Sequence, residues 1–263
     1  MDYETLKESI VKWIKDWFDK NGKDCTAVIG ISGGKDSTVT AALCKEALGS
    51  DRVLGVLMPN GDQSDIEDSY TVVKSLKIPY MVVNIGETYT TLENELSKSG
   101  IVLRDQGSTN LPPRLRMSTL YAIAQGVDKK TGKYINGRVA NTCNLSETMV
   151  GWETRWGDQV GDFSPLGNLT KTQVVEIGKL YKEIPGHLIE KAPSDGLTGK
   201  ADEDNLGTTY EMIDRYITDP DEEEIPERDR KIIEEKIKAS EFKRKSINIP
   251  IFMSWSLTTK RQV

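Results

Sequence analysis

The fold is decided by the stretch Thr26-Ala27-Val28-Ile29-Gly30-Ile31-Ser32-Gly33-Gly34-Lys35-Asp36-Ser37. Its apolar start, Thr26–Ile29, has the length and the β-branching of a buried strand. Residues 38–48 carry few charges, and Gly49 follows them at the place where helices commonly end in a glycine. The stretch therefore predicts a strand, a glycine turn and a helix, in that order.

The glycine turn is a predicted phosphate site. A strand–turn–helix arrangement points backbone N–H groups and the positive end of a helix dipole at one place, which suits a phosphate. The hydroxyls of Ser32 and Ser37 and the ammonium group of Lys35 add further donors. Asp36 would repel a phosphate unless a cation lay between them. This acid therefore predicts Mg²⁺, held jointly by its carboxylate and by phosphate oxygens.

Two better-known phosphate loops do not fit this sequence. A Walker A loop needs a glycine where Ile29 stands, and a serine or threonine where Asp36 follows Lys35. A dinucleotide-binding fingerprint needs a glycine two residues after Gly30, where Ser32 stands. The plainer alternative is a glycine turn with a solvated lysine–aspartate pair, which leaves the doubled glycine and the flanking hydroxyls unexplained.

Strands that alternate with helices predict an α/β fold with a doubly wound, mostly parallel sheet flanked by helices. Ligands of such sheets bind at the carboxyl ends of the strands, where Gly30 and Met58 lie. Met58 is therefore a candidate adenine contact, and a plain core residue is the alternative. Further strands are predicted at Val53–Met58, Ile78–Ile85 and Tyr134–Ala140. Helices are predicted over 3–20, 64–76 (with a capping box of Ser64 and Glu67), 88–98, 210–217 and 228–239, and from 112 and 169; 104–112 and 193–205 are predicted as irregular or loop segments.

Composition excludes several classes of protein. The length of 263 residues suits one large domain or two small ones, and we expect a single domain over 1–263. The net charge of −6 argues against a nucleic-acid partner. No apolar run approaches the roughly 20 residues that span a membrane, and the acidic N-terminus does not resemble a signal peptide. Three separated cysteines without a C-x-x-C pair predict a reduced, cytoplasmic protein without structural zinc.

Three cations fall near predicted helix starts. Arg114 and Arg116 lie in the first turn of the helix expected from residue 112, and Lys171 lies in the first turn of the helix expected from residue 169. The helix dipole disfavours cations at these positions. We therefore expect an anion beside each: a phosphate or a carboxylate for the arginines, and a phosphate for Lys171.

Glu147 has two interpretations. Either Asn144 or Ser146 can cap a helix here, and Glu147 is then an ordinary acid of the first turn. The alternative makes Glu147 a second carboxylate ligand of Mg²⁺. Spacing alone favours the first interpretation.

The phosphate loop resembles that of the ATP pyrophosphatases, which carry S-G-G-x-D-S after a strand. Beyond the loop, the chain resembles the ammonia-dependent NAD synthetases from about residue 25 to 250. The matching blocks are Asn110 with Arg114-Leu115-Arg116-Met117 and Leu120-Tyr121-Ala122, Thr142 with Asn144-Leu145-Ser146-Glu147, Gly151 to Asp158, Pro165 to Gln173, Glu190 to Ser194 and Asp202 to Gly207. Other ATP pyrophosphatases do not share these blocks.

The resemblance implies an adenine nucleotide alpha hydrolase-like fold, a homodimer, and roles for individual residues. A lid-like loop is expected at about 193–207, and a C-terminal helix and tail at about 222–263. The implied ATP-binding residues are Gly30 to Ser37 (Gly30, Ile31, Ser32, Gly33, Gly34, Lys35, Asp36, Ser37), Thr142, Lys171 and Ser194. The implied Mg²⁺ ligands are Asp36 and Glu147, the deamido-NAD contacts are Arg114, Arg155, Asp162 and Lys243, and the catalytic residues are Lys35, Asp36 and Lys171.

Two positions depart from the family pattern. Phe242 stands where the family usually has a histidine before Lys243, which puts half of that dinucleotide contact in doubt. In the lid segment Asp195 lies one place earlier than the family's acid, so no role is transferred to it.

The resemblance also implies a reaction. The nicotinate carboxylate of deamido-NAD attacks the α-phosphate of ATP and releases pyrophosphate, and ammonia then displaces AMP from the acyl adenylate. One alternative keeps the same loop with another acceptor, such as a tRNA base or a purine, and the acidic pI of about 5.1 argues against tRNA. A second alternative is a regulatory nucleotide-binding module without turnover.

Free ammonia, not glutamine, is the expected nitrogen source. Glutamine-dependent enzymes carry a nucleophilic cysteine activated by neighbouring groups. The single histidine, His187, falls near a predicted turn, and Cys25, Cys44 and Cys143 stand in contexts that predict poor nucleophiles. About thirty residues precede the phosphate loop, which is short for an added catalytic domain.

Overall fold

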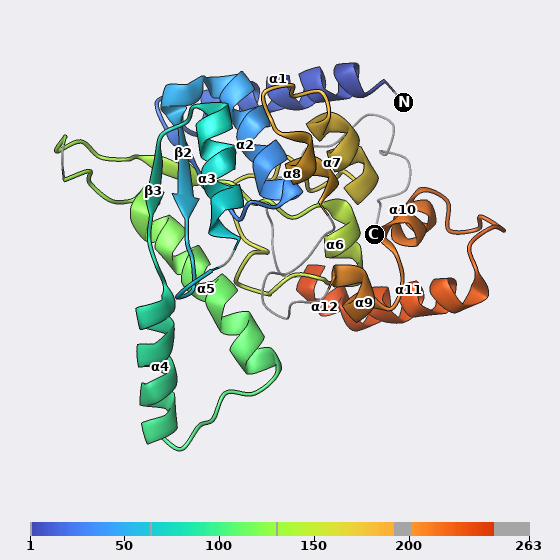
Figure 1. The fold of residues 1–263 in the computed structure, drawn as a ribbon. Helices are drawn as coiled ribbons and strands as arrows, with labels where there is room; N and C mark the ends of the chain where they lie inside the picture. Colours follow the sequence, from blue (N-terminus) through green and yellow to red (C-terminus); the bar gives the residue numbers. More distant parts are fainter. Residues whose placement is uncertain (1, 64, 130, 192–200, 245–263) are drawn as a thin grey trace.

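The structure is a computed structural model and describes residues 2–63, 65–129, 131–191 and 201–244. A four-stranded sheet lies at its centre, with the strand order β3-β2-β1-β4 and every pairing parallel (Figure 1). The chain proceeds from β1 outward to β3 and then crosses to the other side of β1 for β4. A topological switch point therefore lies between β1 and β4. The strands are β1 (Thr26–Gly30), β2 (Val53–Leu57), β3 (Tyr80–Val82) and β4 (Gly137–Val139).

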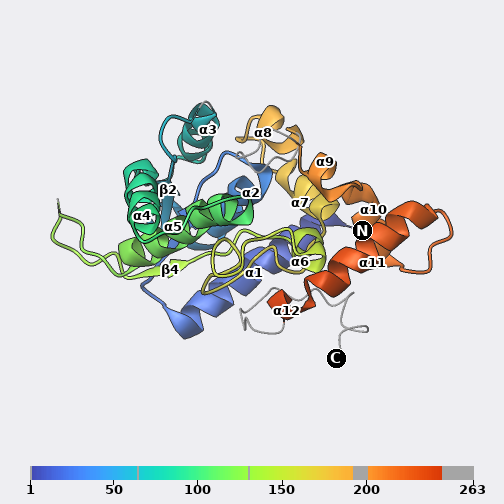
Figure 2. The same ribbon diagram turned by 90° about the horizontal axis from the view of Figure 1, so that it is seen from below.

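Helices cover both faces of the sheet, which confirms the predicted α/β architecture (Figures 1 and 2). Side chains of β1 alternate between the two faces: Ala27 and Ile29 pack with one core, and Val28 packs with the other. All three are fully buried, and burying a valine or isoleucine side chain stabilises the fold by about 1.5–3 kcal/mol. The first core is covered by α1 (Tyr3–Asn21), α2 (Lys35–Leu48), α3 (Ile66–Leu76), α7 (Lys171–Gly178) and α8 (Gly186–Glu190), and the second by α5 (Gln106–Ala124) with α4 (Gly86–Lys98) beside it.

A separate group of helices packs beyond α6 and α7, on the side away from the sheet (Figures 1 and 2). Its own apolar core joins Val150, Leu206, Tyr210, Ile213 and Ile233. This core holds residues 201–244 against the two helices that follow β4. The helices of this group are α9 (Asp202–Leu206), α10 (Tyr210–Thr218), α11 (Glu227–Ala239) and α12 (Glu241–Arg244), and α6 spans Leu145–Val150. A short 3-10 turn, η1 (Ser50–Arg52), precedes β2.

The two outer strands are shorter than predicted. Backbone bonds to the neighbouring segment continue past β3, from the Val83 N–H to Leu57 O (2.9 Å) and from the Ile85 N–H to Pro59 O (2.8 Å), and the side chain of Asn84 binds the backbone of Gly61 and Gly86. Before β4, Tyr134 forms an isolated antiparallel bridge with Val127. The apolar pattern thus predicted the extended segments. The paired strands are shorter, because pairing also requires a neighbouring strand of the same length.

Helix α5 begins six residues before the predicted start and contains both Pro112 and Pro113. Proline removes an N–H donor at a cost, but its φ angle is helical, so a helix can pass through it. Arg114 and Arg116 are therefore not in a first turn, and the dipole argument for an anion beside them was wrong. Their guanidinium groups donate to backbone carbonyls instead, Arg114 Nε to Arg155 O (3.2 Å) and Arg116 Nε to Met58 O (3.1 Å).

Two further predictions concern segments that the structure describes only in part. Residues 202–206 form the short helix α9, which overlaps the end of the predicted loop 193–205, while 192–200 lie outside the described residues. The capping box expected of Ser64 also lies outside them, and α3 begins at Ile66.

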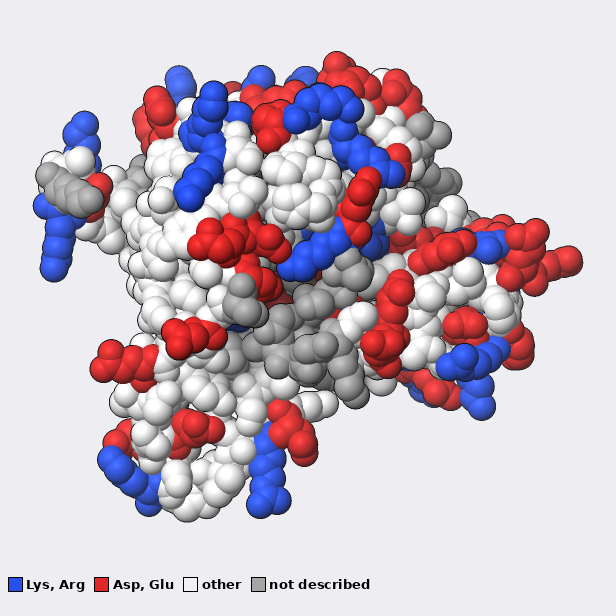
Figure 3. All heavy atoms as spheres, viewed as in Figure 1, with Lys and Arg blue, Asp and Glu red and all other residues white. Residues whose placement is uncertain are grey.

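None of the helices in the described part of the chain is both long enough and apolar enough to cross a membrane. Acidic and basic side chains are interspersed over the face drawn in Figure 3.

Candidate active site

The turn between β1 and α2 has the predicted form. The Ser32 N–H donates to Ser37 Oγ (3.2 Å), and the Gly34 N–H donates to Ser32 Oγ (3.2 Å). Ser37 Oγ in turn donates to the Gly34 carbonyl (3.1 Å). The serine hydroxyls therefore fix the backbone of the loop at the N-terminus of α2.

Gly33 is the residue of this turn that requires glycine. Its φ is +79°, and a Cβ there would lie 2.7 Å from Asp68 Cβ and 2.9 Å from Ser69 N. The loop thus packs directly on the start of α3, with no room for a side chain between them.

Replacing Gly33 by alanine should destabilise the protein and weaken ATP binding at least tenfold. The left-handed backbone alone costs an alanine about 1–2 kcal/mol, and the clash displaces the loop in addition. Gly49→Ala is the matched control, since Gly49 has a φ of +84° with open space around it. Urea unfolding and calorimetry with ATP measure both effects, and equal ATP affinity in the two variants would contradict the prediction.

Three charged side chains meet beside the loop. Lys171 Nζ lies 2.7 Å from Asp36 Oδ2 and 2.8 Å from Glu147 Oε1. Asn144 supports both acids: its Nδ2 donates to Asp36 Oδ1 (2.9 Å), and its backbone N–H donates to Glu147 Oε2 (3.3 Å). The two carboxylates therefore face one cation from opposite helices, α2 and α6.

The structure confirms the capping interpretation of Glu147, and its role as a Mg²⁺ ligand stays a prediction. Glu147 closes a capping box with Asn144, as an ordinary first-turn acid would, and its other oxygen still reaches Lys171. The pKa of the Glu147 carboxyl is raised to about 7: burial is the main cause, Lys171 opposes the shift and Asp36 adds to it. Burial disfavours the charged form of Lys171, but Asp36 and Glu147 together hold its pKa above the ordinary value. Within the protein, the partners of Lys171 are thus two carboxylates, and a phosphate contact of Lys171 stays a prediction.

Lys35 is a second buried cation at the mouth of the loop, with 8% of its surface exposed. Burial lowers the pKa of its ammonium group, and the positive charge of Lys171 lowers it further. Lys35 begins α2 and Lys171 begins α7, so two cations lie at helix N-termini beside the loop, an arrangement that favours an anionic ligand.

The donor set fits Mg²⁺. In the part of the chain that the structure describes, no three His, Cys, Asp or Glu side chains converge as a protein-only metal cage would require. Mg²⁺ is instead commonly bound by one or two carboxylates together with substrate phosphates. Asp36 and Glu147, which converge on one cation at a phosphate loop, match that pattern.

The loop opens into a cavity of about 1110 Å³. Nearly all of the predicted site residues line it, and only Gly33 and Asp162 among the described ones do not. Ser194 lies outside the described residues. Predicted residues in the lining are Gly30, Ile31, Ser32, Gly34, Lys35, Asp36, Ser37, Met58, Arg114, Thr142, Glu147, Arg155, Lys171 and Lys243.

The predicted dinucleotide contacts Arg155 and Lys243 lie together in this cavity. The Arg155 guanidinium group lies over two aromatic rings. Its Cζ atom is 5.2 Å from the ring centroid of Trp156 and 5.3 Å from that of Phe242. Lys243 Nζ donates to the carbonyls of Gly151 (2.8 Å) and Glu153 (2.6 Å). Phe242, which replaces the family's histidine, thus holds Arg155 through its ring face.

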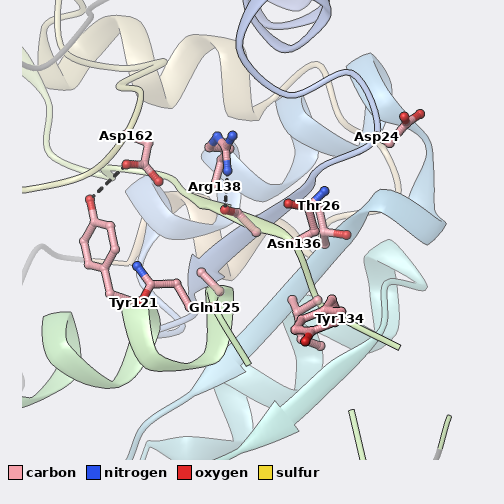
Figure 4. A pocket seen from close by; sticks show the side chains of 11 residues that line it. Asp24, Thr26, Tyr121, Gln125, Tyr134, Asn136, Arg138 and Asp162 are labelled. Carbon is pink, nitrogen blue, oxygen red and sulfur yellow. Dashed lines mark hydrogen bonds between the residues drawn. The ribbon is translucent and has the colours of Figure 1, made fainter. Parts of the chain in front are cut away.

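Asp162 lies apart from the other predicted contacts. It lines a second cavity of about 810 Å³ near the amino ends of β1 and β4 (Figure 4). Its carboxylate accepts hydrogen bonds from Tyr121 Oη (3.3 Å) and from the Val139 N–H (2.8 Å). These bonds tie Asp162 to β4 and α5, and Asp162 does not line the large cavity that Arg114, Arg155 and Lys243 line.

Sequence reasoning missed three residues that support the charged cluster. Asn144 was considered only as a cap. Tyr210 places its ring 4.8 Å from Lys171 Nζ, and Asp214, one turn later, accepts a hydrogen bond from the Thr172 N–H (2.8 Å). The distance between 171 and 210 along the chain left no local pattern that would have linked them.

A glycine loop at the switch point of a parallel sheet, with charged groups gathered beside it, defines a nucleotide-binding α/β enzyme. The sequence model of the family described as NAD synthase matches residues 6–247. The chain belongs to this family, and it is an ATP-dependent ligase of NAD biosynthesis.

Individual relatives agree with this assignment. An NH3-dependent NAD+ synthetase from Finegoldia magna is 39% identical over 249 residues, which cover 93% of this chain and 95% of the relative. One from Thermococcus kodakarensis is 38% identical over 218 residues, covering 82% and 81%. Among solved structures, an NMN synthetase from Francisella tularensis is 30% identical with a TM-score of 0.80, covering 96% of this chain and all of that one.

Proposed function

We propose that this protein amidates the nicotinate carboxylate of deamido-NAD, using ATP and free ammonia. The convergence of Asp36, Glu147 and Lys171 at the phosphate loop, inside one cavity with Arg114 and Arg155, carries the proposal. Single small-ligand pockets are commonly about 300–1,000 Å³, so the larger cavity of about 1110 Å³ has a volume that suits two nucleotides.

The first half of the reaction needs positioning and charge neutralisation. An oxygen of the nicotinate carboxylate attacks the α-phosphorus of ATP, and the bond to the β-phosphate breaks to release pyrophosphate. Bound Mg²⁺ would neutralise phosphate charge, with Asp36 and Glu147 as its protein ligands. The Lys35 and Lys171 ammonium groups add positive charge where the leaving group develops negative charge.

In the second half, ammonia attacks the acyl carbon of the adenylate. The C–O bond to AMP breaks, and the nitrogen loses a proton to give the amide. The cysteines of the chain take no part, since all three are buried, and burial raises the pKa of the Cys44 and Cys143 thiols above the ordinary value. A buried neutral thiol is a poor nucleophile for glutamine.

Turnover with alternative acceptors tests the proposal. We expect deamido-NAD, ATP, Mg²⁺ and ammonium chloride to yield NAD and AMP, with kcat/KM at least tenfold above that for nicotinic acid mononucleotide. Ammonia-free glutamine should support essentially no NAD formation. Xanthosine monophosphate and unmodified tRNA serve as controls for other acceptors, and AMP formation with either would contradict the assignment.

A second candidate substrate is nicotinic acid mononucleotide, favoured by the likeness to the Francisella tularensis NMN synthetase. A higher kcat/KM for the mononucleotide would establish it in place of deamido-NAD. The homodimer, the cytoplasmic location and the single-domain boundaries expected from the sequence stay predictions.

A further inference from the structure

Helix α7 begins at Lys171, and its first N–H groups are bound by side chains from other elements. The Lys171 N–H donates to Ser146 Oγ (2.9 Å), and the Thr172 N–H donates to Asp214 Oδ2 (2.8 Å). Only the Gln173 N–H is bound locally, by the N-cap Thr170 (3.3 Å). Side chains of α6 and α10 therefore complete the N-terminus of the helix that carries Lys171.

The same carboxylate also fixes α6. Ser146 Oγ donates a hydrogen bond to Asp214 Oδ1, so the hydroxyl links Asp214 to the Lys171 backbone. Ser146 is fully buried and Asp214 is 7% exposed. Glu147 follows Ser146 directly on α6. The buried carboxylate of Asp214 therefore sets the positions of both Glu147 and Lys171 beside the phosphate loop.

Helix α10 adds a second contact on the same side. Tyr210 lies four residues before Asp214, which places the two side chains on one face of the helix. The Tyr210 ring lies 4.8 Å from Lys171 Nζ, and its hydroxyl donates to Asp202 Oδ2 (3.2 Å). On this one face of α10, Tyr210 thus contacts the side chain of Lys171, and Asp214 binds the backbone of α7.

We propose that Asp214 is a positioning residue, which holds Lys171 and Glu147 in register by binding the first turn of α7 and the Ser146 hydroxyl of α6 together. The inference rests on the proposed function, which assigns Lys171 and Glu147 their roles in the reaction. Asp214 itself does not line the large cavity. It acts through its two hydrogen-bond partners, as buried groups behind a reactive site commonly do.

The charge of Asp214 suits this role. An acid near a helix N-terminus is stabilised by the helix dipole, and hydrogen bonds to a charged acceptor are stronger than neutral ones. Asparagine keeps the shape and one acceptor oxygen but has no second acceptor for Ser146. Asp214→Asn should therefore loosen the link between α6 and α7 without leaving a cavity.

The test compares four proteins: wild type, Asp214→Asn, Ser146→Ala and the double variant. We expect Asp214→Asn to lower kcat about 10- to 100-fold, the scale seen when a supporting partner is lost, while KM for the acceptor changes less than threefold. Ser146→Ala should act in the same direction. The double variant should lose much less than the product of the two single losses, because both changes break one link.

Ile213→Ala provides the control for stability. Ile213 is the fully buried neighbour of Asp214 on α10, and it packs only in the apolar core of that helix group. It should lower the urea midpoint and leave kcat within about threefold. A folded Asp214→Asn protein with kcat near wild type, or a loss matched by Ile213→Ala, would overturn the proposal.

Calorimetry with ATP and Mg²⁺ supplies a readout that does not depend on turnover. Asp214→Asn should weaken this binding at least fivefold, and unchanged affinity would count against the positioning role. If wild type formed no NAD with either acceptor, the proposed function would fail. The binding comparison would still decide whether Asp214 positions the site.

Discussion

Asp36→Asn is expected to lower turnover by about a hundredfold or more, the scale of losing one key electrostatic contact. Asp36 lies in the first turn of α2, directly at the phosphate loop, and its carboxylate faces Glu147 across Lys171. Asparagine keeps the acceptor for the Asn144 amide but cannot supply a charged oxygen to Mg²⁺. Glu147→Gln should behave alike, since the amide oxygen preserves the capping bond to Asn144.

The double variant tests whether the two acids share one ion. Residues that act as a unit give losses far from additive, so Asp36→Asn with Glu147→Gln should cost much less than the product of the single losses. Glu176→Gln is the control on α7, where an exposed pair with Lys179 has no role in the site. Strictly multiplicative losses in steady-state assays at saturating Mg²⁺ would contradict a shared ion.

Lys171→Met is expected to have the second large effect. Lys171 is 5% exposed, and it neutralises two acids that are themselves largely buried. Removing one partner of a buried ion pair commonly costs about 3–5 kcal/mol. We expect a loss of that order in the free energy of unfolding, measured in urea, and a fall in turnover of about a hundredfold or more.

The effect of Mg²⁺ on the melting temperature of Lys171→Met distinguishes the loss of the ammonium charge from the loss of side-chain packing. Without the ammonium group, two carboxylates face each other, so Mg²⁺ alone should raise the melting temperature of Lys171→Met more than that of wild type. Lys45→Met is the control, because Lys45 forms a more exposed pair with Glu183 at 3.3 Å, and such pairs contribute less than about 1 kcal/mol. Equal Mg²⁺ shifts in variant and wild type would argue against paired carboxylates at this site.

Local sequence was sufficient to predict the α/β class, the strand β1, the helix α2 and the turn between them. A buried strand needs a continuous apolar run, and the turn needs a glycine at position 33. Both features can therefore be recognised from the residue types in the sequence. Family resemblance added the long-range residues, including Glu147, for which spacing alone favoured a capping role. That role is also present, because one carboxylate has two oxygens and uses both.

Other features depended on contacts between distant segments. Lys171 pairs with Asp36 across 135 positions, and Asp214 of α10 binds Ser146 and Thr172, which lie 68 and 42 positions away. The Pro112-Pro113 pair predicted a helix start, but tertiary packing carried α5 through both prolines. Short-range patterns report hydrogen bonding and burial within a few residues. Ion pairs and shared caps depend on how elements pack, so only the tertiary structure revealed the support that α10 gives to the site.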